Sequence, residues 1–204
     1  RNPQFPPAVA SHVSHDPLPW SDSMRRAGPA FVLLLLCLST DLTAQTYQPL
    51  TPLPNTRAED VTTIDSIIPA LYATISGGPG VARQWDRFHT LFHPNAQMVP
   101  TRCGATKCIA RFMTPREYQQ RADSLLTTLG FREHELARRT DRYGAIAQAY
   151  SSYASFKHGE TTPFSRGINS FQLFWDGTRW WIMSIVWDDE RPDNPLPKDL
   201  EGMK

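Results

Sequence analysis

The chain has 204 residues, 40% of them hydrophobic, and 21 Lys and Arg against 20 Asp and Glu give it a net charge of +1. This length and hydrophobic content suit one core rather than two. The near balance of charge gives no electrostatic reason to bind nucleic acid or an anionic membrane surface, so neither partner is expected.

The N-terminal segment has the pattern of an export signal. Met24-Arg25-Arg26 precedes an apolar run over 30–38, and polar residues follow as far as Ala44. A basic start, a short apolar run and a small residue before the cleavage point are typical of a secretory signal peptide. The apolar run is well short of the roughly 20 residues that span a bilayer, so no stable membrane anchor is expected. We predict a secreted or periplasmic protein, with a signal peptide from Met24 cleaved near Ala44.

Proline divides the chain into a folded region and two extended ends. Many of the 18 prolines gather near the two ends, where they oppose helix and inner strand. The pattern predicts a Pro-rich linker over 45–57, a folded domain over 58–191 and an extended tail over 192–204. Residues 1–23, upstream of the signal peptide at 24–44, are expected to be a non-native or disordered leader.

Two cysteines, Cys103 and Cys108, remain after the signal peptide is removed. A short loop containing Gly104 separates them, and an exported protein meets oxidising conditions, so a disulfide is favoured. Two free thiols are the alternative. Zinc is disfavoured because only two of four ligands are present in this segment.

Apolar spacing predicts the secondary structure along the mature chain. Helical spacing is found over 60–76 and 81–92, and Thr114-Pro115-Arg116-Glu117 has the signature of a capped helix start, which opens a helix that ends at Leu129. Alternating residues then predict a short strand before this helix and four after it, at 96–101, 132–143, 145–157, 168–175 and 180–187. An Asp176-Gly177 turn joins the last two strands into a hairpin. The order predicts an α+β domain that ends in an antiparallel meander.

One passage carries a resemblance to a known family. Trp85-Asp86-Arg87-Phe88-His89-Thr90-Leu91-Phe92-His93-Pro94-Asn95-Ala96, together with the final hairpin, resembles the nuclear transport factor 2-like (SnoaL-like) superfamily, which includes polyketide cyclases, ketosteroid isomerases and scytalone dehydratase. The ending at 187–195 looks like that of an uncharacterised bacterial subgroup. The resemblance covers about 58–197. It implies a cystatin-like fold, in which a cone-shaped curved antiparallel sheet wraps around three helices and encloses a pocket, and a homodimer through the outer sheet face.

Alternation along the last hairpin predicts which side chains line this pocket. If Trp187 faces inward, Met183 and Ile185 do so as well, with Asn169, Phe171 and Leu173 on the neighbouring strand. Trp85 and Phe88 join them from the second helix. Tyr150 and Tyr153 lie on opposite faces of one strand, so only one of them can enter the pocket, and Tyr150 is preferred. Such a mostly apolar pocket suits a small hydrophobic molecule, and no cofactor is expected.

The resemblance to ketosteroid isomerases implies roles for two of these groups and leaves one unfilled. Tyr72 falls where the family has a donor tyrosine, and Asn169 falls near the second donor. The base maps to Pro100 or Thr101, neither of which can take a proton from carbon. Ligand binding without an assigned reaction is therefore the preferred function. The alternatives are a cofactor-independent isomerase or lyase, of cyclase or dehydratase type, that uses Tyr72, His89 and Asn169, and a structural dimer with a filled pocket.

A metal site at His89 and His93 is also considered. At i and i+4 the two imidazoles would share one face of the second helix. No Glu-x-x-His motif accompanies them, so no metal is expected.

Overall fold

The computed structural model describes residues 53–104 and 106–202, all within one compact unit, Tyr47–Lys204. The leader and the signal peptide predicted for 1–44 lie outside these residues, as does most of the linker. The helices are α1 (Ala58–Val61), α2 (Ile64–Ile75), α3 (Trp85–Leu91), α4 (Pro115–Leu129) and the 3-10 helix η1 (Lys198–Leu200). The strands are β1 (Phe92–Cys103), β2 (Cys108–Ala110), β3 (Phe131–Tyr143), β4 (Ile146–Lys157), β5 (Ser165–Trp175) and β6 (Trp180–Asp189).

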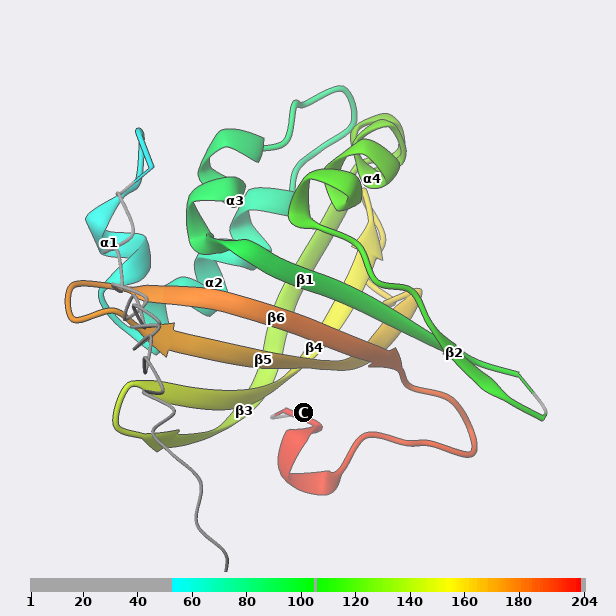
Figure 1. Cartoon of the computed structure of the whole chain (residues 1–204). Coiled ribbons are helices and arrows are strands. Elements are labelled where there is room, and N and C mark those ends of the chain that lie inside the picture. The colour runs from blue at the N-terminus through cyan, green and yellow to red at the C-terminus, as the bar shows by residue number, and fades with distance from the viewer. Residues whose placement is uncertain (1–52, 105, 203–204) are drawn as a thin grey trace, which may run out of the picture. The chain divides into compact units, whose positions relative to one another are not determined.

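The six strands form one sheet in the order β2-β1-β6-β5-β4-β3. Strands β3 to β6 make the predicted antiparallel meander, and β1 joins the sheet parallel to β6. The sheet is curved, and α2, α3 and α4 lie on one side of it (Figure 1). The predicted α+β class, with a curved sheet around three helices, is confirmed.

Local capping sets where α2 and α4 begin. Thr114 accepts a hydrogen bond from the Glu117 amide, and the Glu117 side chain accepts one from the Thr114 amide, as the sequence predicts for α4. The helix predicted over 60–76 is instead two helices. Thr63 is extended, and its hydroxyl accepts a hydrogen bond from the Ser66 amide at 3.0 Å, so α2 starts anew after α1.

The helix predicted over 81–92 is shorter than expected, because α3 begins only at Trp85. The preceding segment is held in a non-helical path by Arg83, whose side chain is buried. Its guanidinium donates hydrogen bonds to the carbonyls of Val81, Gly77 and Leu126, at 2.8, 2.9 and 2.5 Å. A buried guanidinium needs such partners, and the Val81 carbonyl, which would have bonded within the predicted helix, is one of them.

The core lies between the helices and the sheet. Ile67 and Ile68 of α2, Phe88 and Leu91 of α3, and Ile182 of β6 are all fully buried there. Burial of such side chains contributes roughly 1.5–3 kcal/mol each, so this layer fixes the helices on the sheet.

The segment predicted as an extended tail over 192–204 contains a helical turn and packs on the outer side of the sheet (Figure 1). Leu196 and Leu200 are 6% and 0% exposed. Asp199 accepts a hydrogen bond from Arg139 of β3 at 2.8 Å. The prediction of an extended tail was wrong for Lys198–Leu200, which form a helical turn, because Leu196 and Leu200 are buried and hold the segment in place.

The predicted disulfide between Cys103 and Cys108 is present. It joins residues that face each other across the β1–β2 hairpin. None of the helices in the described part of the chain combines the length and apolarity that a bilayer crossing requires.

Candidate functional site

A cavity of about 850 Å³ opens between the helices and the concave face of the sheet. This volume lies within the usual range for small-molecule sites, roughly 300–1,000 Å³. Its walls come from α2, α3, α4 and all strands except β2. The lining residues that matter below are Leu71, Phe88, Tyr118, Glu133, Tyr153, Ser155, Arg166, Asn169, Ile185, Trp187, Asp189 and Glu190.

One wall of the cavity is apolar and aromatic. Tyr118 of α4 stacks on Phe88 of α3 with ring centroids 5.8 Å apart, and its ring meets Trp187 edge to face at 6.3 Å. Ile185 and Leu71 complete this wall and are buried. The rings hold one another in place, so the wall is a formed surface for an apolar group.

The lining also includes a carboxylate, Glu133 of β3. The Ser155 hydroxyl donates to Glu133 Oε2 at 2.6 Å. Burial raises the pKa of Glu133 to about 7, the hydrogen bonds from Ser155 and Asn169 offset part of this rise, and the charge of Asp189 adds to it. Near neutral pH both protonation states of Glu133 are therefore populated.

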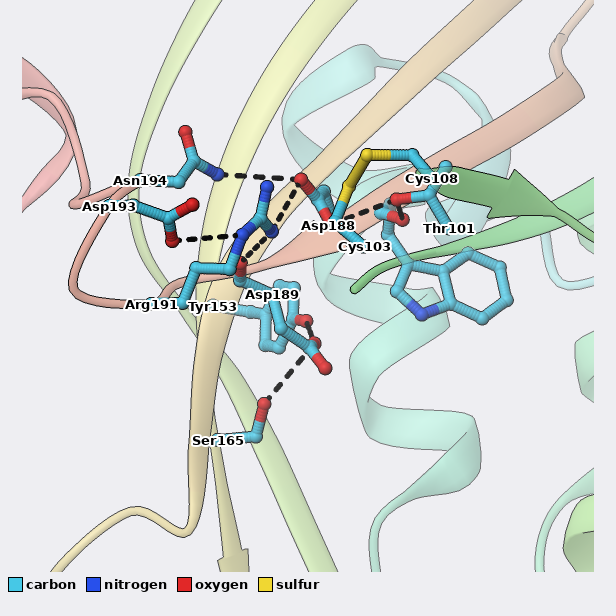
Figure 2. Close-up of polar contacts among 11 residues, drawn as sticks. Thr101, Cys103, Cys108, Tyr153, Ser165, Asp188, Asp189, Arg191, Asp193 and Asn194 are labelled. Carbon is cyan, nitrogen blue, oxygen red and sulfur yellow. Dashed lines mark hydrogen bonds and ion pairs between the residues drawn. A yellow bond between two sulfur atoms is a disulfide. The ribbon is translucent and has the colours of Figure 1, made fainter. Parts of the chain in front are cut away.

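A second carboxylate, Asp189, lies at the end of β6. The Tyr153 hydroxyl donates to its Oδ1 at 2.5 Å and Ser165 does so at 3.3 Å, as Figure 2 shows. The neighbouring Asp188 points to the other face of the strand, where it accepts a hydrogen bond from Thr101 at 2.9 Å. Burial is the largest cause of the raised pKa of Tyr153, and the hydrogen bond to Asp189 is the next. This hydroxyl therefore stays protonated.

Glycine is required opposite Tyr153. Gly167 pairs with Tyr153 across β4 and β5, and a Cβ at this position would lie 2.6 Å from the tyrosine hydroxyl and would also collide with the Asp188 carbonyl. The missing side chain gives the tyrosine room to cross the strand and reach Asp189. This geometry depends on strand register, which local sequence does not specify.

Half-buried and exposed side chains also contribute to the lining. Arg166 and Glu190 form an ion pair at 3.2 Å, with side chains 33% and 25% exposed. Arg102 lines the cavity as well and is exposed, as is Phe164. Charged groups at this exposure interact weakly with each other, so they set the local field more than they add stability.

Tyr72 is tied into a buried hydrogen-bond chain. Asn169 Nδ2 donates to the Tyr72 hydroxyl at 3.1 Å, that hydroxyl lies 2.7 Å from Ser151 Oγ, and Ser151 donates to Glu135 at 2.7 Å. Since the one proton of Ser151 goes to Glu135, the Tyr72 proton points to Ser151. Tyr72 is 3% exposed, and burial raises its pKa. Its hydroxyl is therefore not directed at a ligand in this arrangement.

The two histidines lie apart from the cavity lining. His89 Nε2 is hydrogen-bonded to Gln119 at 2.6 Å. The expectation that His89 and His93 share a helical face was wrong, because α3 ends at Leu91 and His93 belongs to β1, where its Nδ1 accepts from the Asn95 amide at 3.1 Å. Within 53–104 and 106–202, no group of three or more His, Cys, Asp or Glu side chains is placed to hold a metal.

The predicted ligand-binding residues divide between the cavity and the core. Phe88, Asn169, Ile185 and Trp187 line the cavity. The other members of the predicted set do not: Trp85, Phe171 and Leu173 are buried in the core.

Tyr150 and Met183 lie elsewhere. Tyr150 is on the outer face, 36% exposed, and lines a smaller depression of about 290 Å³ beside the C-terminal segment, so Tyr153 takes the inward place instead. Met183 falls at a bulge, because Leu173 pairs with Ile182 whereas the preceding Gln172 pairs with Ser184. The bulge turns Ile182 rather than Met183 toward the core.

Two carboxylates of the cavity, Glu133 and Asp189, are not among the lining residues predicted from the sequence. Asp189 continues the alternation from Ile185 and Trp187, and this signal was available in the sequence. Glu133 had no comparable signal, because nothing local fixed which face of β3 meets the helices.

Comparison with known proteins gives structural likeness only. No family model matches the chain, and no curated protein matches it. Similar solved structures include a cystatin-like protein of unknown function from Nostoc punctiforme PCC 73102, with 10% identity, 67% of this chain and 98% of that one covered, and a TM-score of 0.47. A nuclear transport factor 2-like protein of unknown function from Methylobacillus flagellatus KT has 16% identity, coverage of 64% and 96%, and a TM-score of 0.40. Another from Shewanella baltica OS155 has 14% identity, coverage of 64% and 98%, and a TM-score of 0.39.

Proposed function

We propose that the cavity binds a small molecule with an apolar body and a polar end. One observation carries this proposal: a single cavity has aromatic rings on one wall and the carboxylates Glu133 and Asp189 among its other lining groups. An apolar body would pack on Phe88 and Trp187 and leave water, while the carboxylates would orient the polar end.

The test is to fill the cavity and measure binding. Ile185 faces the cavity, whereas its neighbour Val186 is 39% exposed on the outer face. By calorimetry, 1-naphthalenemethanol is expected to bind the wild-type protein and Val186→Trp, and to lose affinity for Ile185→Trp by about tenfold or more, because the indole takes its space. Equal affinity for the two variants, with circular dichroism showing both folded, would contradict the proposal.

Proton transfer is a second candidate function, which the raised pKa of Glu133 in the cavity favours. A carboxylate with a pKa of about 7 is well matched to act as a general base near neutral pH. Tyr118 also lines the cavity, where its hydroxyl can donate to an oxygen that gains charge. This assignment replaces Tyr72 and His89, whose hydrogen bonds lie elsewhere.

The base can be tested with 5-nitrobenzisoxazole, which needs no co-reactant. The base takes the C3 proton, the C–H electron pair forms the nitrile, and the N–O bond breaks to release a phenolate. We expect Glu133→Gln to lower the rate by about a hundredfold and the exposed Glu160→Gln to leave it unchanged. Equal rates in the two variants would remove the catalytic role.

We also propose that the chain is exported. The Cys103–Cys108 disulfide is consistent with an oxidising compartment, and the signal pattern at Met24 to Ala44 supplies the route. Fractionation of an expressing bacterium should find the processed chain outside the cytoplasm. Recovery of unprocessed protein in the cytoplasm would contradict export.

A homodimer through the outer sheet face remains our proposal for assembly. Tyr150 and Val186 are partly exposed on this face, and Leu196 of the C-terminal segment lies beside them. The C-terminal segment would therefore form part of the interface. Sedimentation should show a dimer that Val186→Glu converts to a monomer, and a monomeric wild-type protein would refute the proposal.

A further inference from the structure

The two carboxylates of the cavity keep unused acceptor capacity. Each carboxylate accepts up to about four hydrogen bonds. Ser155 and Asn169 serve Glu133, and Tyr153 and Ser165 serve Asp189. Half of the acceptor capacity of both carboxylates is left for a ligand, which must then supply the donors.

Within the described residues, neither carboxylate forms a side-chain ion pair: Arg191 donates to the backbone carbonyl of Asp189 at 3.1 Å and is attracted by its charge, but its side chain pairs with Asp188 and Asp193. Arg166 also lines the cavity but pairs with Glu190 at 3.2 Å, and Arg102 is exposed. The charge of Asp189 disfavours ionisation of Glu133 and helps to raise its pKa, and a cation bound near both carboxylates would offset this cost.

The aromatic wall of the cavity attracts cations, as the carboxylates do. Tyr118 and Trp187 line the cavity together with Phe88, and their rings are fixed by contact with one another. Aromatic faces attract cations, most strongly when water is excluded, and also pack against apolar groups.

We propose that the ligand is a small amine, with its positively charged nitrogen held by Glu133 and Asp189 and its apolar body packed against Tyr118 and Trp187. This inference rests on the proposed function, because it requires that the cavity bind a small molecule. It names the chemical class of that molecule.

Three probes of one shape test the proposal on the full chain. They are 1-naphthylmethylamine, which is cationic, 1-naphthalenemethanol, which is neutral, and 1-naphthaleneacetate, which is anionic. At about pH 8 the amine is expected to bind at least about tenfold more tightly than the alcohol, and the acetate more weakly than both. If the alcohol binds as tightly as the amine, the inference fails while the proposed function stands. If no probe binds, both fail.

Variants that remove one charge identify the carboxylates that bind the amine. Glu133→Gln keeps the shape of the side chain and should reduce amine affinity by about tenfold while leaving alcohol affinity unchanged. Glu160→Gln is the matched control, since Glu160 is exposed outside the cavity. Asp189→Asn gives a second, independent measurement if Glu133→Gln does not fold. Amine affinity unchanged in both cavity variants would overturn the proposal.

The pH dependence of amine affinity distinguishes binding through the charge of Glu133 from binding through the shape of the cavity. The titratable groups near Glu133 are Asp189 and the tyrosines Tyr72, Tyr118 and Tyr153, whose raised pKa values keep them neutral. The charged side chains of Arg102, Arg166 and Glu190 line the same cavity. Amine affinity should therefore rise between about pH 6 and 8 as Glu133 ionises, with no such rise for the alcohol or in Glu133→Gln. A flat profile for the amine would contradict the assignment to Glu133.

Discussion

Replacing Glu133 with glutamine is expected to make the protein relatively more stable at high pH. In the unfolded chain this carboxyl group ionises near pH 4.5, whereas in the folded protein burial raises its pKa to about 7. The unfolded state therefore loses the proton first as the pH rises. The stability that Glu133 contributes is complete below pH 4.5, declines between 4.5 and about 7, and is lost above that range.

The size of this effect follows from the two pKa values. A shift from 4.5 to about 7 corresponds to about 3 kcal/mol of unfolding free energy. Glutamine does not ionise, so the stability of Glu133→Gln relative to wild type should rise by about 3 kcal/mol between about pH 4.5 and 8. Urea unfolding at both pH values measures this difference, and Glu160→Gln controls for a glutamate in water. A change below about 1 kcal/mol would refute the burial of Glu133 in the folded state.

Three further changes test the surrounding structure. Gly167→Ala should destabilise the fold by about 2 kcal/mol, because its methyl group would lie 2.6 Å from the Tyr153 hydroxyl, whereas Gly104→Ala, with its nearest neighbour at 3.8 Å, should not; equal thermal midpoints would contradict this. Arg83→Met should cost about 3 kcal/mol in urea unfolding by leaving buried carbonyls without donors, and the exposed Arg116→Met should cost little; a similar loss in both would remove the assigned role. Reduction of the Cys103–Cys108 disulfide, which closes a short loop, should lower stability by about 2 kcal/mol, and an unchanged urea midpoint would show that the loop is not constraining the unfolded chain.

Local chemistry made much of the fold predictable from sequence. The capping box at Thr114 and the Asp176 turn act over a few residues, and in the structure Asp176 Oδ1 accepts from the Thr178 amide at 2.7 Å. Such signals do not depend on the rest of the chain. The meander and the start of α4 were therefore predicted correctly.

The cavity was less predictable because its lining depends on register. A bulge at Met183 reverses the alternation on which the predicted lining relied, and no local signal marks it. The inward place of Tyr153 depends on its pairing with Gly167, and that of Glu133 on the face that β3 turns to the helices. Long-range packing decides these three placements.

The most direct test of a ligand-binding cavity is a methyl NMR titration of the protein with 1-naphthalenemethanol. Leu71 and Ile185 line the cavity, whereas Val186 and Leu196 line the separate depression on the outer face. We predict that the probe shifts the methyl signals of Leu71 and Ile185 and leaves those of Val186 and Leu196 in place. Shifts confined to Val186 and Leu196, or no shifts at all, would contradict the assignment of ligand binding to the cavity.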